Sequence, residues 1–587
     1  MSGATAEFDA VLTAILANRL DSIVRDMTNT LLRSARSAVI NSARDFSCAI
    51  TTADNQLLAS AEGLPVHIFG AQLQTAVLAE NHPDMREGDA YLDNDPYRGG
   101  SHAADHTILV PVFVEGEHMF TAVAKAHQAD IGNSIASTYH AEARDIYEEG
   151  ALIFPTVQVQ RDFEDIDDVI RMCKSRIRVP SQWYGDYLAA IGSARIAERR
   201  LQELCAKYGK DAVRQFVTDW LNYSEQRMMK EIEKLPARTL YHTGRHDAFH
   251  PYLPDGVDIN CRIEIKPDQA AIVVDLLDNP GALDCGLNMT KATTLAAVFT
   301  GLFNSFGGGE IPRNSGSFRR VEVKLRQGGA VGVPEFPHSC SLATTNVTDR
   351  VINMVGSAFA QLGAPYGISE AAVGMGPAMA VLSGKDPRYE NEAFVNQIFV
   401  QANGGPASAG SDGWVTYGLP VICGLMYRDS IEIDEVKMPI QYGEVSLIVD
   451  SGGAGEYRGG PAIRTSYAPK NTEVTVIYPC DGHETPPQGV LGGGAGQVAG
   501  AWLIEADGTE TNLPANATVV LQPGQAIRGV DTSGGGYGEP THRNPERVAN
   551  DVREQWVSAE AAREIYRVAL NDDLSVDAEA TAVLRSR

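Results

Sequence analysis

The chain has 587 residues, which is enough for about three to four domains of ordinary size. Its 75 acidic and 49 basic residues give a formal net charge of −26, which argues against nucleic acid or an anionic membrane surface as a partner. The N-terminal residues lack the basic region and continuous apolar core of a signal peptide, and no apolar run reaches the roughly 18 residues of a membrane span. We therefore expect a cytoplasmic protein.

The eight cysteines are scattered along the chain and include no C-x-x-C pair. This distribution is neither a disulfide framework nor a zinc ribbon. We expect reduced thiols with mostly structural roles.

The first part of the chain predicts helices followed by strands. Residues 7–43 carry apolar side chains at helical spacing, which predicts one long or two consecutive amphipathic helices. Residues 45–72 predict two short strands around a turn at 53–56, then a loop that contains Pro65 and His67. Two apolar runs, 108–114 and 120–126, flank a turn at 115–117 and predict a β-hairpin. A loop, a short helical turn and a strand are expected over residues 134–159.

The rest of the chain changes character twice. Residues 164–235 show helical apolar repeats, and residues 257–279 alternate apolar and polar side chains in two arms around 266–268. Helices are expected again at 290–303 and 348–361. Glycine-rich segments then alternate with strands, as in a β-rich domain; these segments are 402–414, 450–460, 486–496 and 533–540. The chain should end in two helices, the second beginning near Ser558, and a polar tail for which disorder is an open alternative.

These patterns predict a multi-domain α+β protein with a helical N-terminal half that carries a β-hairpin site, and a β-rich C-terminal part with glycine loops. The predicted divisions are 1–160 for the N-terminal helix and hairpin region, 161–237 for a helical region, 238–400 for an α+β domain, 401–545 for a glycine-rich β domain, and 546–587 for the C-terminal helices and tail.

No nucleotide-binding motif is present in the sequence. The glycine runs at 306–309 and 327–329 lack the strand-glycine-helix context and the lysine of a P-loop, and no complete G-x-G-x-x-G lies between a strand and a helix. Three histidines at 242, 246 and 250 lack a spacing that suits one helix face, so a metal site there is disfavoured. We predict no bound nucleotide cofactor in this chain.

Imidazole and carboxylate groups gather at one end of the predicted hairpin. Some come just before its first apolar run and others just after its second: His102, Asp105 and His106, then His127 and Asp130. Both groups therefore lie at the same end of the hairpin, where they can converge on a cation such as Zn, Mn or Fe. Polar surface loops are the alternative that these residues alone leave open.

The segments 94–105 and 127–132, which read NDPYRGGSHAAD and HQADIG, resemble the B-type subunit of the hydantoinase, 5-oxoprolinase and acetone carboxylase family. Further similar pieces extend the resemblance from residue 45 to about residue 558. In the carboxylase branch of this family the matching residues hold a metal, which implies His102, Asp105 and His127 as ligands. Gln128 stands where many relatives have a second histidine, so the resemblance leaves the local proton chemistry and the metal identity open.

Other residues near these segments are candidates for catalysis and substrate binding. Asp130 and His106 lie close enough in sequence to the ligands to act as a general base or to orient a ligand. Glu149 either orients a ligating histidine or is a solvated acid, and the solvated acid is favoured. The candidate substrate contacts are His67, Asn94, Gly99 and Gly100. The two glycines are included because glycine lets the backbone approach a ligand closely. For His67, a buried, hydrogen-bonded role is favoured over direct participation at the site.

The resemblance implies a partner, an A-type subunit with an actin-like ATP-binding fold, in a hetero-oligomer such as A2B2. It also implies that ATP activates an unreactive carbonyl. The leading hypothesis is the B-type subunit of an ATP-dependent amidohydrolase that opens a cyclic amide: a hydantoin, 5-oxoproline, or a larger lactam such as caprolactam. One alternative is a subunit of an ATP-dependent ketone carboxylase of the acetone or acetophenone type. The other is a scaffold subunit with a structural metal.

Overall fold

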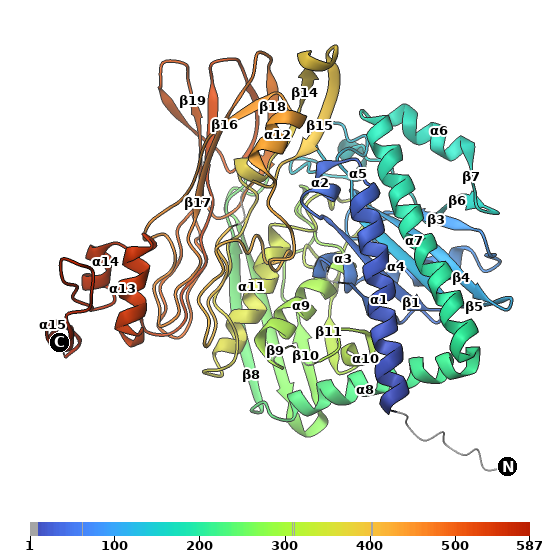
Figure 1. Ribbon diagram of the computed structural model, residues 1–587, viewed down its shortest axis with the longest axis horizontal. Coiled ribbons are helices and arrows are strands. Elements are labelled where there is room, and N and C mark those ends of the chain that lie inside the picture. The colour runs from blue at the N-terminus through green and yellow to red at the C-terminus, as the bar shows by residue number, and fades with distance from the viewer. Residues whose placement is uncertain (1–9, 62, 308, 310, 401–402, 587) are drawn as a thin grey trace.

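The computed structural model describes residues 10–61, 63–307, 309, 311–400 and 403–586. The positions 1–9, 62, 308, 310, 401–402 and 587, which fall in segments discussed above, lie outside the described residues. An N-terminal sheet with its helices lies on one side of the molecule, a second sheet with two helices lies beside it, and a strand-rich part ends in short helices on the other side (Figure 1). No helix of the described ranges is long and apolar enough to cross a lipid bilayer.

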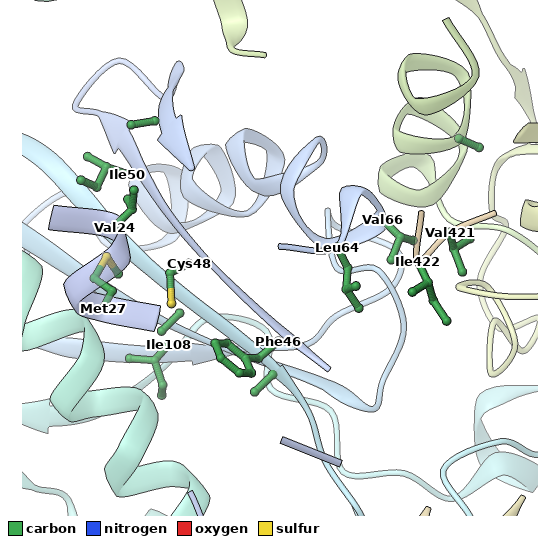
Figure 2. Close-up of a cluster of buried hydrophobic side chains, with 14 of the residues drawn as sticks. Val24, Met27, Phe46, Cys48, Ile50, Leu64, Val66, Ile108, Val421 and Ile422 are labelled. Atoms are coloured by element: carbon green, nitrogen blue, oxygen red, sulfur yellow. The ribbon is translucent and has the colours of Figure 1, made fainter. Parts of the chain in front are cut away.

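The first helices form where apolar residues recur at helical spacing: α1 spans Ala10–Ser34 and α2 spans Ala38–Asn41, as predicted. α1 packs against the long helix α7 (Pro180–Tyr208), and both run across one face of the N-terminal sheet (Figure 1). Figure 2 shows Val24 and Met27 of α1 beside Cys48 and Ile50 of the sheet. The same core therefore joins the first helix to the strands.

The N-terminal sheet has seven antiparallel strands in the order β2-β1-β5-β4-β3-β6-β7. Their bounds are Phe46–Thr52 (β1), Leu57–Ser60 (β2), Ala90–Asp93 (β3), Asp105–Val114 (β4), Glu117–His127 (β5), Val157–Arg161 (β6) and Glu164–Asp165 (β7). β4 and β5 form the predicted hairpin, and its turn residues Glu115 and Gly116 have φ angles of 53° and 79°.

The hairpin is buried on both faces. Alternate side chains of a strand point to opposite faces. Ile108 and Val110 belong to the core shared with α1 and α7, whereas Leu109 and Val123 pack with Phe299 of α9 (Lys291–Ser305) on the other face. Because a slip of one residue would exchange these two faces, burial on both sides fixes the register.

The other helices of this half are α3 (Pro65–Ile68), α4 (Ala71–Asn81), α5 (Ile146–Glu149), α6 (Asp167–Arg176) and α8 (Lys210–Ile232). They agree with the prediction except for α4, which lies mostly where no element was predicted, and α3. The segment predicted as a loop around His67 is instead the short helix α3. Pro65 occupies its first turn, where the missing N–H of proline costs no intrahelical hydrogen bond.

The middle part contains a four-stranded sheet in the order β11-β10-β9-β8, and α11 (Val347–Ala360) packs on β8 and on α9. The strands are Arg238–His246 (β8), Val257–Lys266 (β9), Ala271–Asp275 (β10) and Val321–Lys324 (β11). The short elements are α10 (Ser315–Phe318), β12 (Arg326–Gln327) and β13 (Gly332–Val333). The two arms predicted around 266–268 are β9 and β10, and both predicted helices are present.

The C-terminal part is built on two sheets, in the orders β15-β14-β18-β21 and β16-β17-β22-β19-β20. The strands are Val381–Asp386 (β14), Glu392–Gln397 (β15), Ile440–Leu447 (β16), Ile463–Pro469 (β17), Val474–Pro479 (β18), Gly500–Ile504 (β19), Glu510–Leu513 (β20), Asn516–Leu521 (β21) and Ala526–Val530 (β22). The helices are α12 (Ile431–Lys437), α13 (Pro545–Arg553), α14 (Ala559–Glu564) and α15 (Ala578–Arg585). A disordered tail is wrong for the described residues, because α15 is anchored where Arg585 donates to the Arg543 carbonyl at 2.6 Å.

The hydrophobic cores cross the sequence divisions. One core holds buried residues from Leu16 to Ile422, and a second holds residues from Ala378 to Ile527. β14 and β15 also share a sheet with β18 and β21. The proposed divisions after residues 160, 237 and 400 therefore fall inside shared cores or sheets, although the overall mixture of helices and sheets in several parts agrees with the predicted α+β class.

The glycine-rich segments stack against one another rather than forming separate turns. The Gly460 N–H donates to the Gly405 carbonyl at 2.9 Å, the Gly534 N–H to the Gly460 carbonyl at 3.0 Å, and the Gly453 N–H to the Gly534 carbonyl at 2.9 Å. A Cβ added at Gly534 would overlap the Gly405 carbonyl oxygen. Glycine is required here because backbones approach each other too closely for any side chain.

We predict that Gly534→Ala lowers the stability of the protein by about 1–3 kcal/mol, the usual cost of overpacking, seen as a lower midpoint of thermal unfolding. Gly494→Ala is the matched control in the same stack, since its added Cβ would lie 3.4 Å from the Ala454 nitrogen, an ordinary contact. Equal melting temperatures for the two variants would contradict the packing described here.

Candidate functional site

Two adjacent strand ends and the loop before them supply the site. Asp105 begins β4 and is paired directly with His127, the last residue of β5, while His102 lies three residues before Asp105. Because side chains alternate along a strand, Asp105 and His127 both point to the face opposite α7. Members of both polar groups thus lie at the same end of the hairpin in the structure.

The three side chains converge on one point. Asp105 Oδ1 lies 3.0 Å from His102 Nε2 and 3.1 Å from His127 Nδ1, and the two histidine nitrogens are 3.2 Å apart. All three residues are at least 98 % buried. Two imidazole nitrogens and a carboxylate oxygen at such separations can hold a metal ion.

Neighbouring groups hold each imidazole in place. The Ser341 carbonyl lies 2.9 Å from His102 Nδ1 and accepts its proton, which leaves the lone pair of Nε2 directed at the cluster. His127 Nε2 lies 3.0 Å from the Thr138 hydroxyl, and its ring stacks on Tyr139 at a centroid distance of 5.2 Å. The orientation of both imidazole rings is thus fixed by groups outside the cluster.

The second carboxylate oxygen of Asp105 is also occupied. The Ser101 hydroxyl donates to Asp105 Oδ2 at 2.5 Å, and the Lys125 ammonium donates in turn to the Ser101 oxygen at 3.3 Å. His67 Nε2 lies 3.2 Å from the same Oδ2 and 3.6 Å from Asp45 Oδ1. His67 is therefore buried and partnered, the role favoured for it from the sequence, and it touches a carboxylate of the cluster.

Burial and charge act in opposite directions on these groups. Burial alone would raise the pKa of the Asp105 carboxyl, but the His102 and His67 imidazoles hold that pKa well below its usual range. Burial lowers the pKa of Lys125 to about 8, although Asp105 and Asp93 oppose this shift. A buried, ionised carboxylate among imidazoles favours cation binding.

The structure does not bring Asp130 and His106 into this cluster. Both carboxylate oxygens of Asp130 accept hydrogen bonds from Arg178, at 2.5 Å from its backbone N–H and 2.8 Å from its guanidinium. His106 points to the opposite face of β4, where Trp183 of α7 donates to its Nδ1 at 3.2 Å and burial lowers its pKa to about 3. These contacts favour a structural role for Asp130 and His106, in which they hold the hairpin in place, over a role in proton transfer.

The candidate substrate contacts in the loop before β4 shape the backbone. The Asn94 amide donates to the Ala103 and Leu152 carbonyls at 2.6 and 2.9 Å and accepts from the Phe154 N–H at 2.7 Å. Gly99 has a φ of 114°, and a Cβ at Gly100 would lie 2.6 Å from the Asp95 carbonyl oxygen. These three residues therefore position Ser101 and His102 through the loop.

Glu149 is not the solvated acid that the sequence favoured. It is 97 % buried, its Oε2 accepts from the Ser339 hydroxyl at 2.8 Å, and burial raises its pKa. Ser339 lies two residues before Ser341, whose carbonyl fixes His102. Through Ser339, Glu149 thus stabilises the segment whose Ser341 carbonyl orients His102.

Sequence reasoning missed several groups around the cluster. Lys125 could have been predicted to lie near the cluster, because it precedes His127 by two residues and so shares its strand face. Ser101 is adjacent to His102, but nothing in the sequence shows its contact with Asp105. Tyr139 and Ser341 carried no local signal, since the Ser341 carbonyl reaches His102 across 239 positions of sequence.

Known proteins align with this chain along almost its whole length. The family model described as Hydantoinase B/oxoprolinase matches residues 9–540. The chain is 30 % identical to the beta subunit of caprolactamase from Pseudomonas jessenii, over 98 % of this chain and 99 % of that protein. It is 28 % identical to the B-type subunit of the putative D-/L-hydantoinase from Pseudomonas sp. strain NS671, over 99 % and 98 %.

A solved structure carries the same fold. The crystal structure of ATP-dependent caprolactamase from Pseudomonas jessenii matches with a TM-score of 0.86 and 27 % identity, covering 99 % of this chain and 100 % of that chain. The resemblance first seen in segments 94–105 and 127–132 therefore extends over the fold as a whole. The chain belongs to the hydantoinase B/oxoprolinase family.

Proposed function

We propose that this chain is the B-type subunit of an ATP-dependent amidohydrolase, which hydrolyses a cyclic amide together with an ATP-binding A-type subunit. The observation that carries this proposal is the buried cluster of His102, Asp105 and His127 in a chain similar over 98 % of its length to the beta subunit of a caprolactamase. Hydantoins, 5-oxoproline and larger lactams such as caprolactam are the candidate substrates.

The three clustered side chains would hold a divalent cation, for which Zn, Mn and Fe are candidates. The donor set fits such an ion, because it combines two imidazole nitrogens with one carboxylate oxygen, and the proton of His102 is held on the other ring nitrogen by Ser341. A bound cation of this kind would polarise a carbonyl oxygen or lower the pKa of a water molecule to about 7.

The residues around the cluster would orient the ligands and exclude bulk water. Ser101 and His67 hold Asp105 Oδ2, so that Oδ1 faces the two ligating histidines. Lys125 adds a positive charge behind Ser101, where it balances the buried carboxylates. Exclusion of bulk water from the cluster would favour activation of a bound amide over side reactions of the activated species with solvent.

ATP belongs to the partner subunit in this proposal, since the sequence has no P-loop and no complete dinucleotide fingerprint. The A-type subunit would phosphorylate the amide oxygen and release ADP. Water would then attack the activated carbon and the C–N bond would break, and a second water would hydrolyse the resulting acyl phosphate to phosphate and the opened amino acid. A hetero-oligomer such as A2B2 would bring the two sites together.

We predict that Ser101→Ala weakens metal binding by about 10-fold to 100-fold, because it removes one of the two contacts that hold Asp105 Oδ2 without removing a ligand. The measurement is competition of the purified chain with a chelator, followed by metal analysis. Ser175→Ala is the control, because that hydroxyl is exposed and donates to the Met172 carbonyl at 2.7 Å, away from the cluster. Metal affinities that are equal in the two variants would remove Ser101 from this role.

We predict that the complex with its A-type subunit releases ADP and an opened amino acid from a cyclic amide in the absence of bicarbonate. Turnover of a ketone only with bicarbonate would contradict the proposal and favour a carboxylase.

The same assay on His127→Ala should show activity lower by at least about 100-fold, since a ligand matters more than the groups that orient it. His118→Ala is the matched control at the other end of β5, where His118 bonds to Thr121 at 3.1 Å. Full activity of a folded, assembled His127→Ala complex that lacks metal would instead support a purely structural metal.

A further inference from the structure

A small cavity reaches the cluster. One end is formed by Asp45, His67 and His127, and Tyr139 lies beside them. Its volume is about 30 Å³. Because His67 and His127 are the same side chains that contact Asp105, a molecule in this cavity lies directly against the proposed metal centre.

The walls of the cavity are mostly apolar, with two threonines at 344 and 345, and come from distant segments. Leu64 and Val66, at α3, face Val421 and Ile422 across it (Figure 2). Further lining residues are Met375, Met379, Phe399, Leu419 and Met426. Such walls match the methylene groups of a ring, whereas the polar end matches its amide.

Charge distribution limits what the cavity accepts. Among its described lining residues, the ionisable groups are Asp45, His67, His127 and Tyr139, and none is a lysine or arginine. His67 already faces the carboxylates of Asp45 and Asp105, and His127 is a proposed ligand. The proposed metal ion would be taken by the amide, so a carboxylate elsewhere on the substrate ring would be buried near Asp45 with no lysine or arginine to pair with it, which is unfavourable.

The cavity can adapt to a ring larger than its present volume. A volume of about 30 Å³ takes a water-sized molecule, so a lactam enters only when lining side chains move. Three of those side chains are methionines, which are unbranched and repack readily. Adaptation by methionine rotation needs no backbone change in the hairpin.

We propose that this cavity receives the ring of an uncharged lactam, with its methylene groups against the methionines and its amide at His67 and His127, and that it discriminates against rings that carry a carboxylate. The inference rests on the proposed amidohydrolase function and narrows its substrate class. It assigns specificity to Met375, Met379 and Met426, which touch the ring and not the reacting bond.

The first test compares rings that differ only in a carboxylate, using the complex with its A-type subunit. One pair is 2-pyrrolidone and 5-oxoproline; the other is ε-caprolactam and ε-caprolactam bearing a carboxylate on the carbon next to nitrogen. We expect kcat/KM to be at least tenfold higher for the uncharged member of any pair that reacts. Equal or higher values for the charged member would overturn the inference and leave the amidohydrolase function standing. Absence of turnover for every cyclic amide would overturn both.

The second test separates this cavity from its neighbour. Met426→Ala should lower kcat/KM for the best uncharged lactam by about tenfold through KM, because contacts with the ring are lost. Leu425→Ala is the matched control: Leu425 is also partly buried, but it lines a different cavity together with Pro65 and Ile68, so its KM should not change. An equal change in both variants, or none in Met426→Ala, would overturn the assignment.

Discussion

The direct pairing of Asp105 with His127 across β4 and β5 is the constraint on which the site depends. Pairing places the two side chains on one face of the sheet within 3.1 Å of each other, and His102 completes the cluster from the preceding loop. The pairing is held by apolar residues on both faces of the hairpin, because a slip of one residue would turn Ile108 and Leu109 to the wrong sides. The polar site thus owes its geometry to the apolar core around it.

A cluster this deeply buried is stable only when its polar groups are satisfied. Asp105 is contacted by His102, His127, Ser101 and His67 in the structure, and Lys125 supports Ser101. Removing one member leaves the others buried with unmatched charge, which costs more than the lost contact itself. Orientation and stability are therefore properties of one network, and variants around it have to be assessed with separate measurements of folding, metal content and turnover.

Much of the site could be predicted from the sequence because its ligands are local. Two apolar runs around a short turn predicted the hairpin, and Asp105 and His127 were placed at its open end because they flank those runs. Long-range contacts gave no such signal: the Ser341 carbonyl and the burial of Glu149 depend on the middle part of the chain folding against the hairpin. The glycine segments were likewise recognisable by composition, but their stacking depends on hydrogen bonds between residues far apart, such as Gly534 and Gly460.

The proposed metal ligands and the cavity walls lie on different kinds of segment, and this difference bears on how such a site can change its substrate. The proposed metal ligands lie on or beside central strands, where both faces are packed and a substitution disturbs the core. The cavity walls at Leu64, Val421, Ile422 and Met426 come instead from segments outside the strands, which accept substitutions more readily. The chain is similar over nearly its whole length to proteins named for a caprolactam and for a hydantoin. Changes confined to the walls could alter ring specificity while the cluster keeps its geometry, because the two sets of residues are anchored by different parts of the fold.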